Sequence, residues 1–421
     1  MRNRLKMCRF PRGLRHICFP ILFPILISGA WGASTNEECT SAWLVFIAAK
    51  DNIVAQCVYR PKPEDVVWGA MNGLAKDLGP DYARFFPAKR SGTVEEALDA
   101  FKFSLLQLDA EANIPFRTLV AQSIRAYCRT LDQYSDYDDY VAWAKRHEAH
   151  KFNYVGIGVA LVDRMTEGFI LNPFPDGPAE QAGIVGGDFL IEVNGNPVRG
   201  MSKMEVVSLC AGRAGTRVSL KVRHTDRSIE KIDVFREKVD TSPLVIGQTA
   251  TGIRVACSNK ITDQAVEDFR KLLRSRRPAE ELTIDFRGCE GGTVTAAVNL
   301  ASLFLPADTT IGKLEAASGQ EKLISTNKSP YRPSKLTILQ NRFTASAAEL
   351  VIAALVGNRI FPVETRGERT YGKGVAQMQV ELVADAAGPV AGILLITETR
   401  MYGPNNEVWD GEGLAPTVEK K

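Results

Sequence analysis

A short apolar strand that runs into a helix, with a serine at the junction, is the feature that most constrains the fold of this 421-residue chain. Residues 335–340 read KLTILQ, and their run of Leu and Ile predicts a buried strand. Residues 347–356 contain no Gly or Pro and predict a helix. Ser346 therefore stands where the strand turns into the helix. Strand–helix alternation over residues 250–360 favours α/β units, followed by a β-rich ending.

A serine at this position has a chemical use. The first N–H groups of a helix have no partner within the helix, and the helix dipole places partial positive charge there, so an oxyanion would be stabilised. A serine hydroxyl needs a base to become a nucleophile. Lys373, in the segment YGKG, is the candidate, because burial can lower the pKa of a lysine and leave its amine neutral. The alternative is structural, since Ser and Thr before helices are usually caps.

The segments TASAAE and TYGKGVAQ together resemble the S-A-S-A-x-E and T-F-G-K-G-x-x-Q signature of the carboxyl-terminal processing proteases, also called tail-specific proteases. These are serine peptidases with a Ser/Lys dyad. The resemblance implies that Ser346 is the nucleophile, Lys373 the general base and Gln377 the residue that supports the lysine. The backbone N–H of Ala347 would be one oxyanion donor. The family often has Ser where this chain has Thr344 and Ala348, and the Ser-to-Lys interval of this chain is two residues longer.

A second segment, DFRGCEGG, resembles the family's D-L-R-x-N-P-G-G segment, in which a turn glycine supplies the second oxyanion N–H. The resemblance assigns that donor to Gly291. Cys289 and Glu290 stand where the family usually has Asn and Pro. A carboxylate facing the oxyanion would oppose charge development there, whereas one facing away would do little. Cys289 as the nucleophile is a weaker alternative.

Residues 151–238 resemble a PDZ domain. The segment FNYVGIGVALV opens it, a short helix is expected at residues 178–182 and a second at about 202–210, and strands are expected at residues 189–193 and 217–222. A PDZ domain binds a peptide by adding it as a strand to a sheet edge, with the terminal carboxylate held by backbone N–H groups. The resemblance assigns peptide binding to Gly156, Ile157, Gly158 and Val159. The alternative is a PDZ domain that only packs against the peptidase.

The N-terminal 32 residues have the pattern of a secretory signal peptide: six basic residues and no acidic one, then a short apolar run, then small residues. The run is short for a membrane span, although an uncleaved anchor is the alternative. The whole chain has a formal net charge of +3, so residues 33–421 carry −3 and show no basic excess that would indicate nucleic-acid binding. Export permits disulfides; Cys39 and Cys57 either pair or are thiols buried by helices.

The expected architecture is a multidomain α/β protein. It consists of a signal peptide (residues 1–32), a helical N-terminal domain (33–150), a β-rich PDZ domain with two helices (151–238) and a peptidase core (239–421). The family resemblance makes that core an α/β superhelix of the ClpP/crotonase-like kind.

The expected function is that of a serine-type endopeptidase of the C-terminal processing kind, exported to the periplasm or another extracytoplasmic compartment. It would remain membrane-associated if the signal were uncleaved. Its partners would be polypeptides with free apolar C-termini, with an adaptor or regulator left open, and neither nucleic acid nor a stable membrane span is expected. No metal or other cofactor is implied. A catalytically impaired PDZ scaffold is the rival from another class, and a Ser/Lys amidase acting on cell-wall peptides is a third reading that leaves the PDZ domain unexplained.

Overall fold

The computed structural model describes residues 34–418 apart from a set of short gaps. The gaps are residues 88–91, 142, 145–154, 164–168, 175–176, 202, 240–243, 249–251, 258–259, 276–280 and 385–388. The predicted signal peptide lies outside the described residues. Within them, no helix is both long and apolar enough to cross a membrane.

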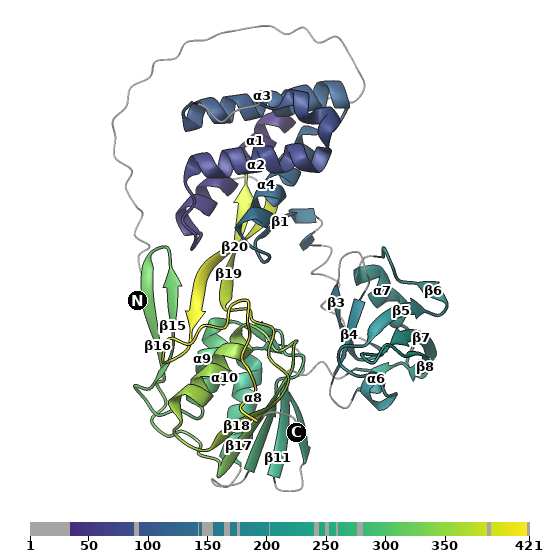
Figure 1. Ribbon diagram of the computed structural model, residues 1–421, viewed down its shortest axis with the longest axis vertical. Coiled ribbons are helices and arrows are strands. Elements are labelled where there is room, and N and C mark those ends of the chain that lie inside the picture. Colours follow the sequence, from purple (N-terminus) through teal and green to yellow (C-terminus); the bar gives the residue numbers. More distant parts are fainter. Residues whose placement is uncertain are drawn as a thin grey trace, which may run out of the picture.

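Four helices form the N-terminal body, drawn in purple and blue in Figure 1: α1 (Asn36–Gln56), α2 (Pro63–Leu78), α3 (Val94–Ala112) and α4 (Phe116–Leu131). A short 3₁₀ helix, η1 (Pro80–Phe85), follows α2. Thr35 and Thr93 begin α1 and α3 with reciprocal capping boxes, because each hydroxyl accepts a backbone N–H while a Glu three residues on accepts the threonine N–H. The helices bury one apolar core between them.

The cysteines of this body settle the alternative left open by the sequence. Cys39 lies in the first turn of α1 and Cys57 is the residue at its C-terminal end. At 1.5 Å per residue the helix separates them by about 27 Å, far beyond the reach of a disulfide. Both are buried thiols in the structure, so the reading as buried thiols is the correct one.

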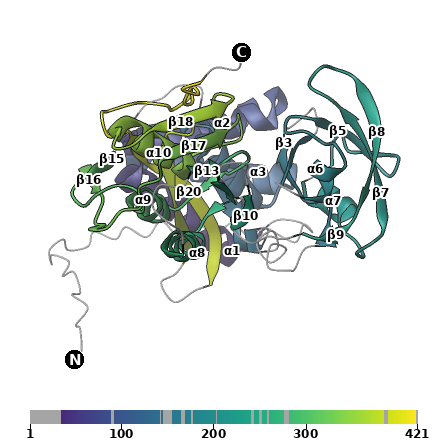
Figure 2. The same ribbon diagram turned by 90° about the horizontal axis from the view of Figure 1, so that it is seen from below.

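The PDZ-like body contains a sheet in the order β3-β4-β5-β7-β8, with β6 (Asn196–Pro197) paired to β5. Its strands are β3 (Val159–Asp163), β4 (Phe169–Pro173), β5 (Phe189–Val193), β7 (Arg217–Arg223) and β8 (Ile229–Phe235), and its helices are α6 (Pro178–Gln181) and α7 (Lys203–Cys210). These bounds agree with the elements expected from the sequence. A separate apolar core lies inside the body. In both views the PDZ-like body lies to one side of the peptidase-like core (Figure 1, Figure 2). The two-residue strands β2 (Val155–Gly156) and β9 (Glu237–Lys238) pair where the chain passes into and out of it.

The peptidase-like core is built on a sheet in the order β10-β11-β13-β17-β18. Strands β11 (Gly252–Cys257), β13 (Glu281–Asp285), β17 (Lys335–Gln340) and β18 (Val363–Gly367) are parallel, whereas β10 (Leu244–Gln248) is antiparallel to β11. Helices α8 (Asp263–Arg274), α9 (Val294–Ser302) and α10 (Ala347–Asn358) pack on it. A small parallel pair, β12 (Lys260–Ile261) and β14 (Gly291–Gly292), lies beyond the strand ends. Because carboxyl ends of parallel strands meet at one sheet edge, the loops after β11, β13 and β17 converge.

A second sheet joins the C-terminal strands to the N-terminal helices. Its path is β1-β20-β15-β16, with β19 paired to β20; the strands are β1 (Asp136–Asp139), β15 (Thr310–Ala316), β16 (Gly319–Ile324), β19 (Val375–Val383) and β20 (Val390–Tyr402). Leu382, Leu394 and Ile396 enter the same apolar core as α1–α4. The helical body therefore packs directly on the hairpin β19–β20, which begins two residues after Lys373 (Figure 1).

Candidate active site

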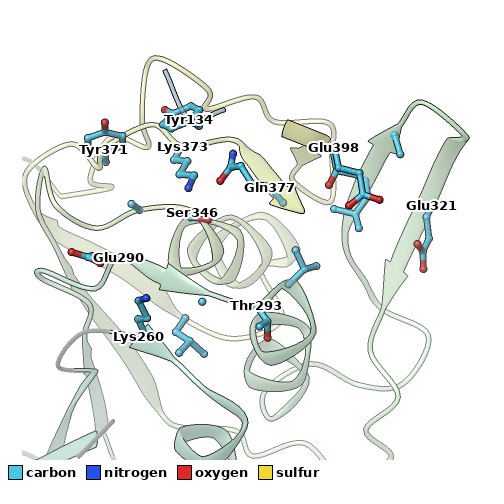
Figure 3. A pocket seen from close by; sticks show the side chains of 18 of the residues that line it. Tyr134, Lys260, Glu290, Thr293, Glu321, Ser346, Tyr371, Lys373, Gln377 and Glu398 are labelled. Atoms are coloured by element: carbon cyan, nitrogen blue, oxygen red, sulfur yellow. The ribbon is translucent and has the colours of Figure 1, made fainter. Parts of the chain in front are cut away.

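The turn between β17 and α10, residues 341–346, ends in a strained serine. Ser346 has φ 57° and ψ −123°, a conformation that non-glycine residues rarely adopt and that costs of order 1–3 kcal/mol. α10 begins at Ala347, so the N–H at the start of the helix lies next to Ser346. Strain of this kind is typical of functional positions, and here it presents the hydroxyl to a cleft (Figure 3).

The glycine loop, residues 288–292, packs against this turn. Gly291 has φ 100°, and a Cβ at this position would lie 2.7 Å from the Ala345 carbonyl oxygen and 2.8 Å from the Ala347 nitrogen. Only glycine lets the two backbones approach so closely. The Ala345 N–H donates to the Cys289 carbonyl oxygen at 2.9 Å, which joins loop and turn. The structure therefore brings the two predicted oxyanion donors, Ala347 and Gly291, to one place.

Side-chain contacts of Asp285 and Thr344 hold the segment that leads into this loop. Asp285 is the last residue of β13, and its side chain is fully buried. Its Oδ2 forms ion pairs with Arg254 Nη2 at 2.6 Å and with Arg287 Nη2 at 2.8 Å. A buried carboxylate paired with two guanidinium groups has its charge compensated. The Thr344 hydroxyl donates to the Phe286 carbonyl at 2.8 Å and adds a further link between β13 and the serine turn.

Lys373 lies in the loop between β18 and β19 and points toward Ser346 (Figure 3). Burial lowers the pKa of Lys373; the charges of Glu290 and Asp132 act in the opposite direction, and the charge of Lys260 lowers the pKa further. Its Nζ lies 5.0 Å from the centroid of the Tyr134 ring. Within the described part of the chain, no hydrogen bond joins the side chains of Ser346 and Lys373. Both side chains line the same cleft.

The sequence reasoning assigned no role to Glu349, yet this residue holds the two loops together. Its side chain is fully buried in the first turn of α10. Oε2 accepts the Ser346 N–H at 2.7 Å and the Lys373 N–H at 2.8 Å, while Oε1 accepts the Thr370 hydroxyl at 2.6 Å and the Gly372 N–H at 2.8 Å. Burial raises the pKa of Glu349, and the four hydrogen bonds act against that rise. A glutamate three residues into a helix could have been noticed as a capping-box pattern.

Gln377, expected to support the lysine, lies on β19 and lines the cleft. Its Nε2 donates to the Thr397 hydroxyl at 3.2 Å. The Thr397 N–H in turn donates to the Ser135 hydroxyl at 3.1 Å. The side chain is therefore anchored to β20 and, through it, to the segment that precedes β1.

The cleft that holds these residues has a volume of about 1180 Å³. Its walls come from the serine turn, the glycine loop, β12 and the hairpin β15–β16. Glu290 lines it with its side chain directed away from Ser346 (Figure 3). Cys289 is fully buried with its sulfur beside that of Cys257, so it is not placed as a nucleophile of this cleft. Among the described residues, no cluster of three or more His, Cys, Asp or Glu could hold a metal ion.

The four residues assigned to peptide binding lie at the start of the PDZ-like body. β3, which begins at Val159, is an edge strand of its sheet. Gly158 has φ 68°, and the carbonyls of Ile157 and Gly158 accept backbone N–H groups of Ala179 and Phe174, both at 2.9 Å. Ile157 is fully buried in the core of this body. The turn is thus held in shape before an open sheet edge.

Residues 251–420 match the model of a family described as peptidase family S41, and residues 169–224 match that of the PDZ domain. The C-terminal part of the chain is therefore similar to S41 peptidases, and the part before it is similar to PDZ domains. The resemblance to carboxyl-terminal processing proteases is confirmed by relatives of that name. The carboxy-terminal processing protease CtpA of Bacillus subtilis is 31% identical over 275 residues, which are 62% of this chain and 57% of that protein. A probable CtpA-like serine protease of Staphylococcus haemolyticus is 27% identical over 292 residues, 67% of this chain and 57% of that protein.

The chain thus spans 57% of the length of these curated relatives. Among solved structures, the photosystem II D1 C-terminal processing protease superposes with a TM-score of 0.60 at 21% identity, covering 90% of this chain and 93% of that one. That likeness confirms the fold class, which is a multidomain α/β protein with a helical N-terminal region, a PDZ-like body and an α/β core.

Proposed function

We propose that this chain is an exported serine endopeptidase that cleaves polypeptides near their C-termini, with Ser346 as nucleophile and Lys373 as general base. The observation that carries the proposal is the pairing of the strained Ser346 turn with Lys373 in one cleft, through the shared Glu349 carboxylate. The match of residues 251–420 to the model of peptidase family S41 supports peptide-bond hydrolysis as the reaction.

The reaction is acyl transfer. Neutral Lys373 takes the proton of the Ser346 hydroxyl as its oxygen attacks a peptide carbonyl. The N–H groups of Ala347 and Gly291 stabilise the oxyanion, and one such donor lowers the barrier by roughly 3 kcal/mol. The lysine ammonium then protonates the leaving amine, and water hydrolyses the acyl-enzyme. The proposed chemistry uses side chains and backbone alone and requires no metal or organic cofactor.

The orientation of Glu290 bears on the choice between this proposal and the scaffold alternative. A carboxylate at the oxyanion would weaken catalysis, but the Glu290 side chain is directed away from Ser346 (Figure 3). The compact junction of Gly291 with Ala345 and Ala347 also favours a competent oxyanion site. The impaired scaffold therefore receives no support from this loop.

We further propose that the PDZ domain receives the free C-terminus of the substrate. The edge position of β3 and the fixed turn at Ile157 and Gly158 support this role, because strand addition needs an open edge and a carboxylate site beside it. The substrates would be unfolded polypeptides with apolar C-termini in the periplasm or another extracytoplasmic compartment. Residues 1–32 would act as the signal peptide.

The test is cleavage of an unfolded exported protein that ends in apolar residues, by the wild type and by Ser346→Ala and Lys373→Ala. We expect cleavage by the wild type alone. Amidation of the substrate's C-terminus should then slow cleavage by removing the carboxylate that the PDZ domain reads. If the wild type leaves the substrate intact while all three proteins bind its tail, the chain is a peptide-binding scaffold.

A further inference from the structure

Two cysteine sulfurs meet directly beneath the glycine loop. The Cys289 Sγ lies 3.4 Å from the Cys257 Sγ, and the two residues are 0% and 2% exposed. Cys257 is the last residue of β11, and Cys289 follows the neighbouring parallel strand β13. No other pair of cysteine thiols in the described ranges makes such a contact.

The backbone of Cys289 is hydrogen-bonded to the turn that carries Ser346. Its carbonyl oxygen accepts the Ala345 N–H at 2.9 Å, and its own N–H donates to Phe286 at 3.0 Å. Two residues later, Gly291 packs against the serine turn with no room for a Cβ. A displacement of Cys289 therefore moves the backbone that lies against the nucleophile.

We propose that Cys257 and Cys289 are a redox-reversible cross-link site that controls the peptidase through the glycine loop; the control, though not the cross-link, rests on the proposed function. The oxidant is a disulfide of the glutathione class. One cysteine thiolate attacks it, forms a mixed disulfide and releases one thiol; the second cysteine then attacks the mixed disulfide and releases the other. Two protein thiols become one disulfide and the oxidant becomes two thiols, so atoms and electrons balance.

Closing the bond has a geometric consequence. The sulfurs must approach from 3.4 Å to about 2.05 Å, the length of a disulfide bond. A cavity of about 10 Å³ borders Cys257 and Phe286, which gives the side chains limited freedom. The rest of the approach of the two sulfurs requires movement of the backbone at Cys257 or Cys289. Because β11 is paired on both sides within the sheet, the loop that carries Cys289 is the part that shifts. A displacement of about 1 Å at an oxyanion donor can cost roughly 100-fold in rate.

Burial sets the conditions of the experiment. Both sulfurs are covered, so exchange in the folded protein proceeds through local opening. The full chain is therefore treated with oxidised glutathione both as the folded protein and during refolding. Remaining thiols are alkylated under denaturing conditions, and linked peptides are mapped by mass spectrometry. We expect a loss of about 2 Da and one linkage, between Cys257 and Cys289.

The oxidised protein should lose at least about tenfold in kcat with little change in KM, and dithiothreitol should restore it. Cys257→Ala should keep the activity of the reduced wild type and become insensitive to oxidation. Cys210→Ala, which removes a buried thiol of the PDZ domain, should remain sensitive. Absence of the linkage under both treatments, a different pairing, or a linked protein with unchanged kcat would overturn the proposal. If the reduced wild type cleaves nothing, the proposed function fails, while the mapped linkage still decides whether the cross-link exists.

Discussion

The buried carboxylate of Glu349 accepts the backbone N–H of Lys373 at 2.8 Å, and the same oxygen accepts the N–H of Ser346 at 2.7 Å. One side chain thus fixes the positions of the candidate nucleophile and base relative to each other. The positions of these two candidate groups are set by the backbone around Glu349 rather than by a contact between their side chains. A change at this carboxylate should therefore affect the proposed dyad without altering the side chain of Ser346 or Lys373.

We expect Glu349→Gln to reduce both stability and activity. Each Glu349 oxygen accepts two hydrogen bonds, so an amide nitrogen in place of either oxygen faces at least one N–H that it cannot accept. A buried donor left unsatisfied costs roughly 1–3 kcal/mol. Thermal unfolding and cleavage rate measure the two effects. Glu381→Gln, an exposed change on β19, is the control and should alter neither. A wild-type melting temperature for Glu349→Gln would contradict the role assigned to the four bonds.

Ser346→Gly should abolish cleavage and stabilise the fold. Glycine adopts φ 57°, ψ −123° without the steric cost that a side chain brings, so the variant should gain about 1 kcal/mol. Ser346→Ala is the matched control, because it also lacks the hydroxyl but keeps the Cβ and its strain. The melting temperature of the glycine variant should exceed that of the alanine variant by a few degrees. Equal melting temperatures would show that the turn stores no strain.

The part of the site that is local in sequence could be predicted, because short-range rules determine it. The apolar run 335–340 and the Gly-free stretch after Ser346 fix a strand and a helix, so the turn between them follows. The glycines of the loop at 288–292 likewise indicate close backbone approach. The roles of Ser346, Lys373 and Gln377 came from the family signature and stay predictions. The hydrogen bond of Gln377 to Thr397 has no signal in the local sequence, since it depends on the pairing of β19 with β20.

The long-range part could not be predicted, because no local pattern encodes it. Tyr137 of β1 pairs with Leu394 of β20, and the N-terminal helices share a core with β19 and β20. Such pairings depend on the whole fold, so no local pattern predicts that the Lys373 Nζ lies over the Tyr134 ring. The separation of Cys39 from Cys57, in contrast, is a direct consequence of the single helix α1 that joins them. The contact of Cys257 with Cys289 required the order of the parallel strands.

Tyr134 should tune the basicity of Lys373 through its ring. The lysine Nζ lies 5.0 Å from the ring centroid, where an aromatic face stabilises the ammonium by roughly 0.5–2 kcal/mol. Tyr134→Leu keeps apolar cover but removes this attraction, so the pKa of Lys373 should fall and the acid limb of kcat/KM should move to lower pH. On that limb, activity should rise about threefold or more. Tyr134→Phe keeps the ring and loses only the hydroxyl that accepts from Gln133, so its profile should match the wild type. Identical profiles for the Leu and Phe variants would exclude a role for the ring.

The pH dependence of the wild type follows from the buried lysine. Burial lowers the pKa of Lys373 from its ordinary value, so the neutral amine appears as pH rises through this lowered pKa. kcat/KM should therefore increase with pH and level off below the range in which an exposed lysine titrates. The linked stability has the same sign. A lysine whose pKa is lowered by folding penalises the folded state below that pKa, and the penalty disappears as pH rises toward the unfolded value.

Glu290 and Lys260, which act on the pKa of Lys373 in opposite directions, should shift that profile in opposite directions. The Glu290 charge raises the pKa of Lys373, so Glu290→Gln should move the acid limb to lower pH. The Lys260 charge lowers it, so Lys260→Gln should move the limb to higher pH. On the limb, each change should alter kcat/KM by about threefold. Both residues are exposed, so both shifts should shrink at 1 M salt, where the Debye length is about 3 Å.

Glu321→Gln, at the far wall of the same cleft, is the control and should leave the limb in place. Shifts in the same direction for the Glu290 and Lys260 variants would show that local rearrangement, rather than charge, governs the base.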